Sequence, residues 1–332
     1  MSDDSDSRDD IGRLIRSAGR GPAASAEART RIYAAAHAAW RRSVGERRAP
    51  RRPLVWLAAA AGVVALVAAA LVLNLALEPA PPGGPVLGSF VRVEGPAELV
   101  SAGQQRRLRS QATGVPIRAG DLLRTGAGGR AAVDLSPGFV LRINGQSAVR
   151  FTSSELLALE RGTLYIDTGA SGIAPALEVR TSLGRVRHLG TQYEVSVNGR
   201  TVRVRVREGE VMFRDGTREV RADAGEQVSI DATGEPVRSA FAPYDPAWGW
   251  VESLAVLRSA SDATVSELLD WAGRERGLTV RYASAATEVE AARLTLHGVD
   301  GLTPAEALDV IEGTTSMRYV ERDGELIVST ER

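Results

Sequence analysis

The chain contains no cysteine, no lysine and only three histidines among its 332 residues. Without cysteine there are no disulfides, no thiolate metal ligands and no cysteine nucleophiles. The histidines, His37, His188 and His297, lie far apart in the sequence, and a long apolar run separates the first from the other two. A metal site shared by all three is therefore excluded. All 41 basic residues are arginine, which we attribute to coding bias rather than to function.

Catalytic motifs are also missing. There is no Gly-x-Ser-x-Gly or Walker motif. The glycine-rich stretch 126–129 is followed by no helical pattern, so no helix N-terminus would hold an anion there, and we interpret it as a β-turn. The sequence predicts a protein that is not an enzyme, with no metal, no cofactor and no small-molecule substrate. An enzyme would need residues such as Asp134, His188 and Glu194 to converge in one pocket.

One long apolar run dominates the N-terminal third. Residues 54–73 carry no charged or polar side chain, and a helix of this length exceeds the roughly 30 Å of a bilayer core. Arginines crowd the side before it, which favours a cytoplasmic N-terminus. A cleaved signal peptide or a buried core helix fits the length and flanks less well. The sequence thus predicts a single-pass protein of the bacterial inner membrane, with residues 1–53 cytoplasmic and residues 78–332 periplasmic.

The net charge of zero conceals an asymmetry. Residues 1–53 hold 12 arginines and 7 acidic residues, whereas residues 78–332 hold 29 arginines and 34 acidic residues. Nothing in the larger part is basic enough to indicate direct binding of nucleic acid.

The first 53 residues contain two short amphipathic patterns. Leu14 and Ile15 belong to the first, and Ile32 and Trp40 to the second. A unit this small can hardly bury a core of its own, so we expect these apolar side chains to contact a cytoplasmic protein. A solvated tail with incidental helicity is the alternative.

Past the apolar run, residues 89–240 show short alternating β-runs punctuated by glycine. Val202, Val204 and Val206 alternate with three arginines, which indicates a strand with one buried and one wet face. The Asn198–Gly199 pair predicts a tight hairpin. Strands this frequent, with little helix between them, predict an antiparallel all-β body.

The last 70 residues contain a repeat. Thr264-x-x-Glu267 recurs as Thr303-x-x-Glu306, and both are capping boxes that open an amphipathic helix. The apolar sides of the two helices include Leu268, Leu269 and Leu308, which we propose as partner-facing. The whole chain is predicted as a multi-domain membrane protein with a cytoplasmic helical segment (1–53), one transmembrane helix (54–77), a Pro/Gly spacer (78–88), an all-β domain (89–240), an aromatic connector (241–260) and a small α+β domain with two similar halves (261–332).

Several blocks of the all-β region resemble the FecR family. They are Val179–Val195, Val204–Val211 and Ala224–Gln227, with earlier pieces at Gly120–Thr125 and Leu159–Tyr165. The resemblance covers roughly residues 90–235 and includes the motif residues Arg180, Gly184, Gly190, Thr191, Tyr193, Glu208 and Gly209. The final 70 residues resemble the short N-terminal domain of secretins and TonB-dependent receptors, on the basis of the repeat and of Leu302–Leu308.

The resemblance implies a regulator of cell-surface signalling. Its N-terminal segment would bind an extracytoplasmic-function sigma factor through Leu14, Ile15, Ile32 and Trp40. Its periplasmic part would sense a TonB-dependent outer-membrane receptor or another periplasmic protein. A membrane-anchored scaffold that binds the cell envelope, without sigma-factor control, is the alternative.

Overall fold

The structure is a computed structural model, and it describes most of the chain from residue 83 onward. The described stretches are 83–110, 112–136, 138–169, 176–188, 192–233, 235–257 and 262–331, together with Glu27, Thr30, Tyr33, Ala34 and His37. The chain divides into two units, Met1–Leu77 and Glu78–Arg332. The five described residues of the first unit are helical and exposed, and the rings of Tyr33 and His37 stack at 6.5 Å.

The predicted fold class, a membrane protein with a cytoplasmic helical segment and one transmembrane helix, is corrected by the structure. The described residues are mostly strand, and none of their helices has the length and apolar composition needed to cross a bilayer. The longest of them has 12 residues, whereas a crossing takes about 20. The predicted span, 54–77, and all but five residues of the predicted segment 1–53 lie outside the described residues.

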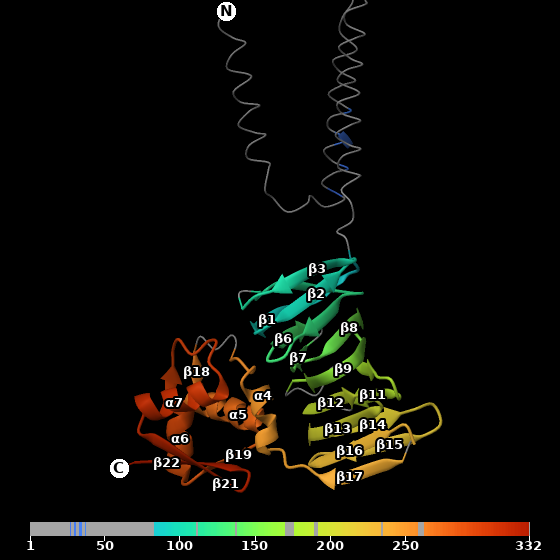
Figure 1. The fold of residues 1–332 in the computed structure, drawn as a ribbon. Helices are drawn as coiled ribbons and strands as arrows, with labels where there is room; N and C mark the ends of the chain where they lie inside the picture. Colours follow the sequence, from blue (N-terminus) through green and yellow to red (C-terminus); the bar gives the residue numbers. More distant parts are fainter. Residues whose placement is uncertain are drawn as a thin grey trace, which may run out of the picture. The chain divides into compact units, whose positions relative to one another are not determined.

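Seventeen strands, β1 to β17, form one hydrogen-bonded network in the described part of the second unit (Figure 1). Their bounds are Val86–Glu94 (β1), Ala97–Ser101 (β2), Gln104–Leu108 (β3), Pro116–Arg118 (β4), Leu122–Thr125 (β5), Arg130–Leu135 (β6), Phe139–Ile143 (β7), Ala148–Ser153 (β8), Leu156–Asp167 (β9), Glu178–Arg180 (β10), Arg185–His188 (β11), Gln192–Asn198 (β12), Thr201–Glu208 (β13), Glu210–Arg214 (β14), Glu219–Asp223 (β15), Glu226–Asp231 (β16) and Pro236–Ala240 (β17). We call these strands the body.

The body has two sheets that share β9. Sheet A runs β4-β1-β6-β7-β9-β12-β13-β16-β17, and sheet B runs β3-β2-β5-β8-β9-β10-β11-β14-β15. The first half of β9 pairs in sheet B and the second half in sheet A. Gly162 lies at the change-over with φ +87°, where a Cβ would come within 2.6 Å of three atoms of Ser147. Only glycine fits this close approach.

The inner faces of both sheets enclose one apolar core. Leu141, Ile166 and Val204 from sheet A join Leu123 and Phe151 from sheet B in it. Alternation along the strands is as predicted, but the expected wet face of sheet A is largely covered: Arg203 and Arg205 are half-buried, and Arg207 is only 3% exposed. The reason is that the C-terminal part of the chain packs on the centre of this face.

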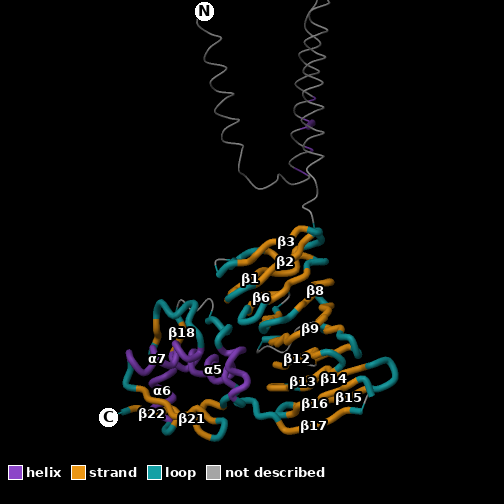
Figure 2. The backbone as a smooth tube through the Cα atoms, viewed as in Figure 1, coloured by secondary structure: helices purple, strands orange, loops and turns teal. Residues whose placement is uncertain are grey.

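That C-terminal part holds all the helices from residue 83 onward that the structure describes (Figure 2). A connector, residues 241–257, contains a 3₁₀ turn η1 (Pro246–Trp248) and the short helix α4 (Gly249–Glu252). Residues 262–331, the C-terminal unit, contain β18 (Ala263–Thr264), α5 (Val265–Arg276), β19 (Thr279–Tyr282), α6 (Ala285–Arg293), β20 (Thr295–Leu296), α7 (Pro304–Thr314), β21 (Met317–Arg322) and β22 (Glu325–Thr330). The three-stranded sheet has the order β19-β22-β21, with β19 parallel to β22.

Both predicted capping boxes are confirmed. Thr264 and Glu267 cap α5, and Thr303 and Glu306 cap α7, each pair exchanging side-chain and backbone hydrogen bonds. Helix α6 was missed by the sequence analysis. Ser284 caps it by accepting from the backbone N–H of Thr287.

Candidate functional site

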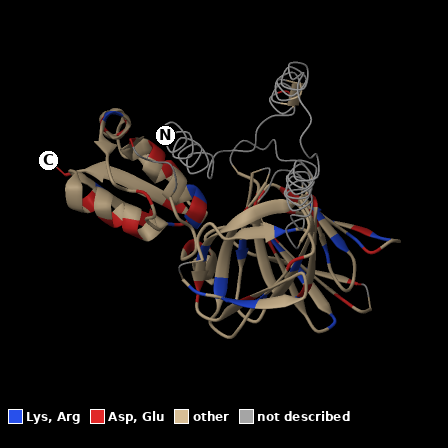
Figure 3. Cartoon of the chain, turned by 90° about the horizontal axis from the view of Figure 1, so that it is seen from above, with Lys and Arg blue, Asp and Glu red and all other residues tan. Residues whose placement is uncertain are grey.

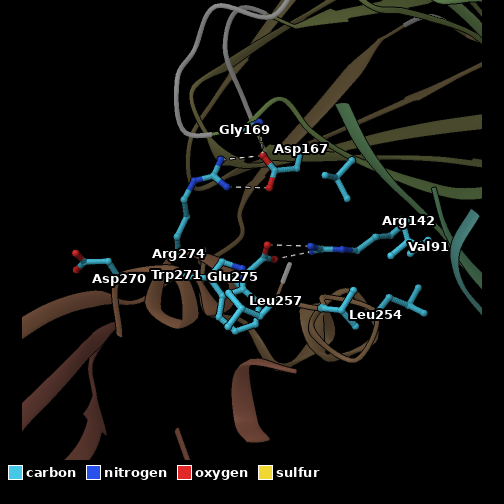
Figure 4. A pocket seen from close by; sticks show the side chains of 13 residues that line it. Val91, Arg142, Asp167, Gly169, Leu254, Leu257, Asp270, Trp271, Arg274 and Glu275 are labelled. Atoms are coloured by element: carbon cyan, nitrogen blue, oxygen red, sulfur yellow. Dashed lines mark hydrogen bonds and ion pairs between the residues drawn. The ribbon is translucent and has the colours of Figure 1, made fainter. Parts of the chain in front are cut away.

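The candidate site is a seam where the connector and α5 meet the outer face of sheet A (Figure 4). A cleft of about 480 Å³ opens along it. The cleft wall is largely apolar, with Val91, Val140, Leu254, Leu257 and Trp271 among its residues. Two ion pairs cross between the body and α5 at one side of this wall (Figure 4).

Strand register brings the polar side chains of the sheet together. Arg142 of β7 pairs across to Tyr165 of β9, Tyr165 to Glu194 of β12, and Glu194 to Arg205 of β13. These residues lie on one face because side chains alternate along a strand, and their neighbours in sequence point into the core. The result is a transverse polar row on a face that the C-terminal part buries.

The first ion pair joins Arg142 to Glu275 of α5. The Nη1 atom of Arg142 donates to Oε2 of Glu275 at 2.7 Å and Nη2 donates to Oε1 at 2.9 Å. Both side chains are less than a tenth exposed. Burial by itself would lower the pKa of Arg142, but the charge of Glu275 and its hydrogen bonds outweigh that and raise it. The guanidinium is therefore permanently charged and depends on Glu275 for its compensation.

The second ion pair joins Arg274 to Asp167, the last residue of β9. It is also bidentate, with both Nη atoms 2.8 Å from the two carboxylate oxygens. Gln192 donates a further bond to Oδ2 at 3.0 Å, and Glu208 lies 3.2 Å from Nε of Arg274. Burial opposes ionisation of Asp167, but the hydrogen bonds and charge of Arg274 outweigh it and lower the pKa of this carboxyl.

Arg207 binds the C-terminal end of α5 and the connector at once. Its Nη1 donates to the backbone carbonyl of Glu275 at 2.6 Å, its Nε donates to the carbonyl of Pro243 at 2.6 Å, and Nη2 lies 3.1 Å from Glu252. The last carbonyls of a helix lack intrahelical donors and carry partial negative charge, so a cation is favourable there. Gly277, with φ +68°, ends α5 where a Cβ would lie 2.0 Å from the Pro243 carbonyl oxygen.

Aromatic side chains of the connector complete the contact. Trp248 is fully buried and meets the rings of Tyr165 and Phe241 edge-on, at 5.8 and 5.4 Å. The guanidinium of Arg205 lies 3.9 Å from the centre of the Phe241 ring, a cation–π contact. The aromatic residues therefore pack against the charged row rather than against solvent.

Glu194 is the carboxylate of the row that is poorly compensated. It accepts from Trp250 at 3.3 Å and lies 3.4 and 3.5 Å from Arg205 and Arg203. Burial is the main influence and raises the pKa of Glu194, and these partners only partly offset it. Burial thus acts on both carboxyls in the same direction, but the net pKa shift is downward at Asp167 and upward at Glu194.

Some polar atoms of the seam have no partner. Nε of Arg142 and the hydroxyl of Tyr165 are buried without a hydrogen bond among the described residues. The two side chains touch, since the Arg142 guanidinium lies 5.4 Å from the centre of the Tyr165 ring. Burial raises the pKa of Tyr165, so its hydroxyl stays protonated. A seam with unpaired buried atoms is less stable than a fully paired one.

Chemically, the seam is suited to holding two parts of a chain in one arrangement. Both carboxylate oxygens of Asp167 accept hydrogen bonds from the Nη atoms of Arg274, and both of Glu275 accept from those of Arg142. Asp167, whose pKa Arg274 lowers, has little capacity to donate a proton.

The residues predicted to form a FecR-like motif fall in different places. Glu208 lies at the seam beside Arg274, and Gly209, with φ +79°, makes the turn between β13 and β14. Tyr193 is in the core, stacked on His188. Gly184 packs against β14, where a Cβ would lie 2.4 Å from the Arg214 carbonyl oxygen.

Of the other predicted residues, Arg180 is exposed on β10, and Gly190 and Thr191 lie outside the described residues, as do Leu14, Ile15, Ile32 and Trp40. Leu268, Leu269 and Leu308, proposed as partner-facing, are buried in the core of the C-terminal unit. The apolar periodicity that marked them in the sequence comes from the packing of this core. A partner would contact other side chains of these helices.

The residues of the alternative enzyme constellation do not converge. Glu194 lies on the outer face of sheet A, whereas His188 packs against Phe139 and Tyr193 within the body, and its Nε2 accepts from the backbone of Leu177. Sequence reasoning missed Arg142, Asp167 and Glu275. The sequence signal that could have identified them is a single charged residue within an otherwise apolar strand, as Arg142 within Val140–Ile143.

No curated protein matches the chain at a significant level. Two crystal structures of a candidate anti-sigma factor from Parabacteroides distasonis are 19% and 18% identical and cover 64% of this chain and 99% of theirs. Their TM-scores of 0.35 are too low to support a conclusion about this chain. The FecR protein family model matches residues 121–212, a stretch narrower than the predicted resemblance but containing Arg142, Asp167 and Arg207, the sheet side of the seam.

Proposed function

We propose that this chain is a signalling regulator of the FecR kind. In this proposal it acts at the bacterial inner membrane, with its N-terminus in the cytoplasm and residues 78–332 in the periplasm. The N-terminal segment binds an extracytoplasmic-function sigma factor, and the C-terminal unit meets a TonB-dependent receptor or another periplasmic protein. The predicted likeness of that unit to the short domain of secretins and TonB-dependent receptors belongs to this proposal.

One observation carries the proposal: the FecR match coincides with the face on which a second folded unit is held. Arg142, Asp167 and Arg207 lie within residues 121–212, and their partners Glu275 and Arg274 belong to the C-terminal unit. A protein that engages the C-terminal unit would therefore act on the matched body through defined ion pairs. This is an arrangement for passing on a binding event.

The test uses tagged full-length chain purified from the source cells, with bound proteins identified by mass spectrometry. We expect a sigma factor in the wild-type sample and its loss in Ile32→Asp and Trp40→Ala. Thr30→Ala, at an exposed position of the same segment, is the matched control and should retain it. A wild-type sample without any sigma factor would contradict the proposal.

A second experiment separates regulation from the scaffold alternative. Residues 1–53 are replaced by an unrelated arginine-rich segment, and sigma-dependent transcription is followed with a reporter. A regulator loses its signal response in this variant, whereas a scaffold keeps its function in the envelope.

A further inference from the structure

The seam relies on buried charged groups, which is unusual for a contact that serves only to keep two parts of a protein together. Two bidentate ion pairs and Arg207 cross it, all with buried charges on at least one side. Replacing a buried ion pair by apolar residues of similar volume is often neutral or stabilising, because ions are costly to remove from water. An ionic seam fixes one docking arrangement but leaves the closed state with little surplus stability.

Unpaired polar atoms also lower the stability of the docked state. Nε of Arg142 and the hydroxyl of Tyr165 are buried and have no hydrogen-bond partner among the described residues. Release of α5 would let water reach Nε of Arg142, whose guanidinium it covers. The closed state therefore bears a cost that opening removes.

The charges of the two sides are complementary. Residues 83–240 hold 21 arginines and 17 acidic residues, net +4, and residues 262–331 hold 6 arginines and 14 acidic residues, net −8. Figure 3 shows the acidic residues along the helices of the C-terminal unit. Such complementarity steers two surfaces back together after they separate, which is a requirement for a contact that opens repeatedly.

We propose that the seam is a latch that opens: the C-terminal unit alternates between a state docked on sheet A and a released state, and a partner that binds the unit shifts this equilibrium to release. Release uncovers Arg142 and Asp167, which pair with α5, while Tyr165 and Glu194 stay against Trp248 and Trp250 of the connector. This inference rests on the proposed function for its biological meaning, because it makes release the step that carries the signal.

Two variants of one ion pair test the latch. Glu275→Gln leaves the Arg142 charge buried without its counter-ion and should release the unit. The double variant Arg142→Met/Glu275→Leu replaces the pair by apolar side chains of similar volume and should stay docked. Because the double variant restores what the single one loses, an effect of misfolding is separated from an effect of the pair. Arg150→Met/Glu160→Leu, an exposed pair on sheet B, is the matched control.

Distances report docking directly. The chain has no cysteine, so Val237→Cys and Val320→Cys, at positions 68% and 61% exposed, accept a pair of spin labels or dyes without background. We expect one narrow distance distribution in the full-length wild type, in the control and in the apolar double variant. Glu275→Gln should broaden it and shift it to longer values. An unchanged distribution in Glu275→Gln overturns the latch.

Transcription then tests its role. The apolar double variant should lose at least tenfold of the signal-induced reporter output, because its unit cannot be released, and the exposed-pair control should keep it. A docked double variant that signals like the wild type overturns release as the signal. If the wild type itself gives no sigma-dependent output, the proposed function fails, and the distance measurements on purified protein still decide the latch.

Discussion

At the scale of single residues, two buried carboxylates on one face of sheet A have opposite electrostatic situations. Burial raises the pKa of both, but Arg274 reverses the effect at Asp167 and no partner reverses it at Glu194. The difference lies in geometry, since Asp167 has a bidentate arginine at 2.8 Å and Glu194 has two arginines at 3.4 and 3.5 Å. Ionisation of Asp167 thus stabilises the fold, and ionisation of Glu194 weakens it.

We predict that Asp167→Asn lowers the free energy of unfolding by up to roughly 3–5 kcal/mol at pH 7, because it removes the bidentate counter-ion of Arg274 and leaves only Glu208, 3.2 Å from Nε. The folded-state pKa of Asp167 lies below its ordinary value of about 3.9, so its contribution is complete above that value and is lost as the pH falls through the folded-state pKa. The gap between wild type and Asp167→Asn should therefore narrow in acid. Denaturant unfolding at pH 7 and near pH 3 measures it.

Glu194→Gln is the matched control for this prediction. The folded-state pKa of Glu194 is raised, so an amide at this position removes an unfavourable charge and still accepts from Trp250. At pH 7 it should cost much less than Asp167→Asn or be stabilising. Equal losses in the two variants would show that the pairing geometry of Asp167 does not decide its contribution.

The sequence revealed this face only in part. Alternation of Val202, Val204 and Val206 with arginines identified which side chains leave the core, and the structure confirms that pattern. It could not show that Arg207 is buried, because the group that covers it, the end of α5, lies 68 residues away in the chain. Charge partners so distant in sequence have no local signal.

At the scale of elements, the end of α5 determines how closely this helix approaches the connector. Gly277 has a left-handed conformation and lies against the Pro243 carbonyl. Its position is doubly restricted, by its backbone angle and by the neighbour that a side chain would meet.

We predict that Gly277→Ala destabilises the protein by more than the roughly 1–2 kcal/mol expected for a left-handed residue with a Cβ, because that atom would also lie 2.0 Å from the Pro243 carbonyl oxygen. Gly298→Ala is the control, since Gly298 has φ +72° with no atom within 4 Å of an added Cβ. Thermal unfolding of both variants gives the comparison. Equal shifts would mean that the close packing at Gly277 contributes nothing.

Helix starts were the best-predicted local features, and one helix was missed. The capping boxes at Thr264 and Thr303 can be recognised from four consecutive residues. The threonine side chain accepts from a free backbone N–H of the first turn, and the glutamate carboxylate accepts from the backbone N–H of the threonine. Helix α6 lacks such a box, and only its Ser284 cap and its alanines indicated it. With a single fully buried apolar side chain, Ala291, it has almost no periodic pattern.

At the scale of the whole molecule, the all-β body was predictable from alternation and turns, because both depend on neighbouring residues. The membrane-protein fold class was not what the described structure shows. Docking of the C-terminal unit on sheet A was also absent from the prediction, since it depends on two surfaces that exist only after each part has folded.

We predict that the body depends on its connector. A fragment ending at Ala240 loses Trp248 and Val251, which are fully buried against Tyr165, whereas a fragment ending at Leu257 keeps them. Loss of a buried tryptophan alone costs roughly 3–5 kcal/mol, so the longer fragment should unfold at a clearly higher denaturant concentration. Coinciding midpoints would show that sheet A is stable without this cover.

Strand β9 has a mechanical consequence. Its Leu156 end pairs with β8 and β10, and its Asp167 end pairs with β7 and β12 and contacts α5. Hydrogen-bonded neighbours on both sides hold the strand in register, so we expect a displacement of Asp167 to be passed along β9 to the strands beyond Gly162. The 12 residues of this strand thus link the two sheets through one continuous stretch of backbone, which passes from one sheet to the other at the closely packed Gly162.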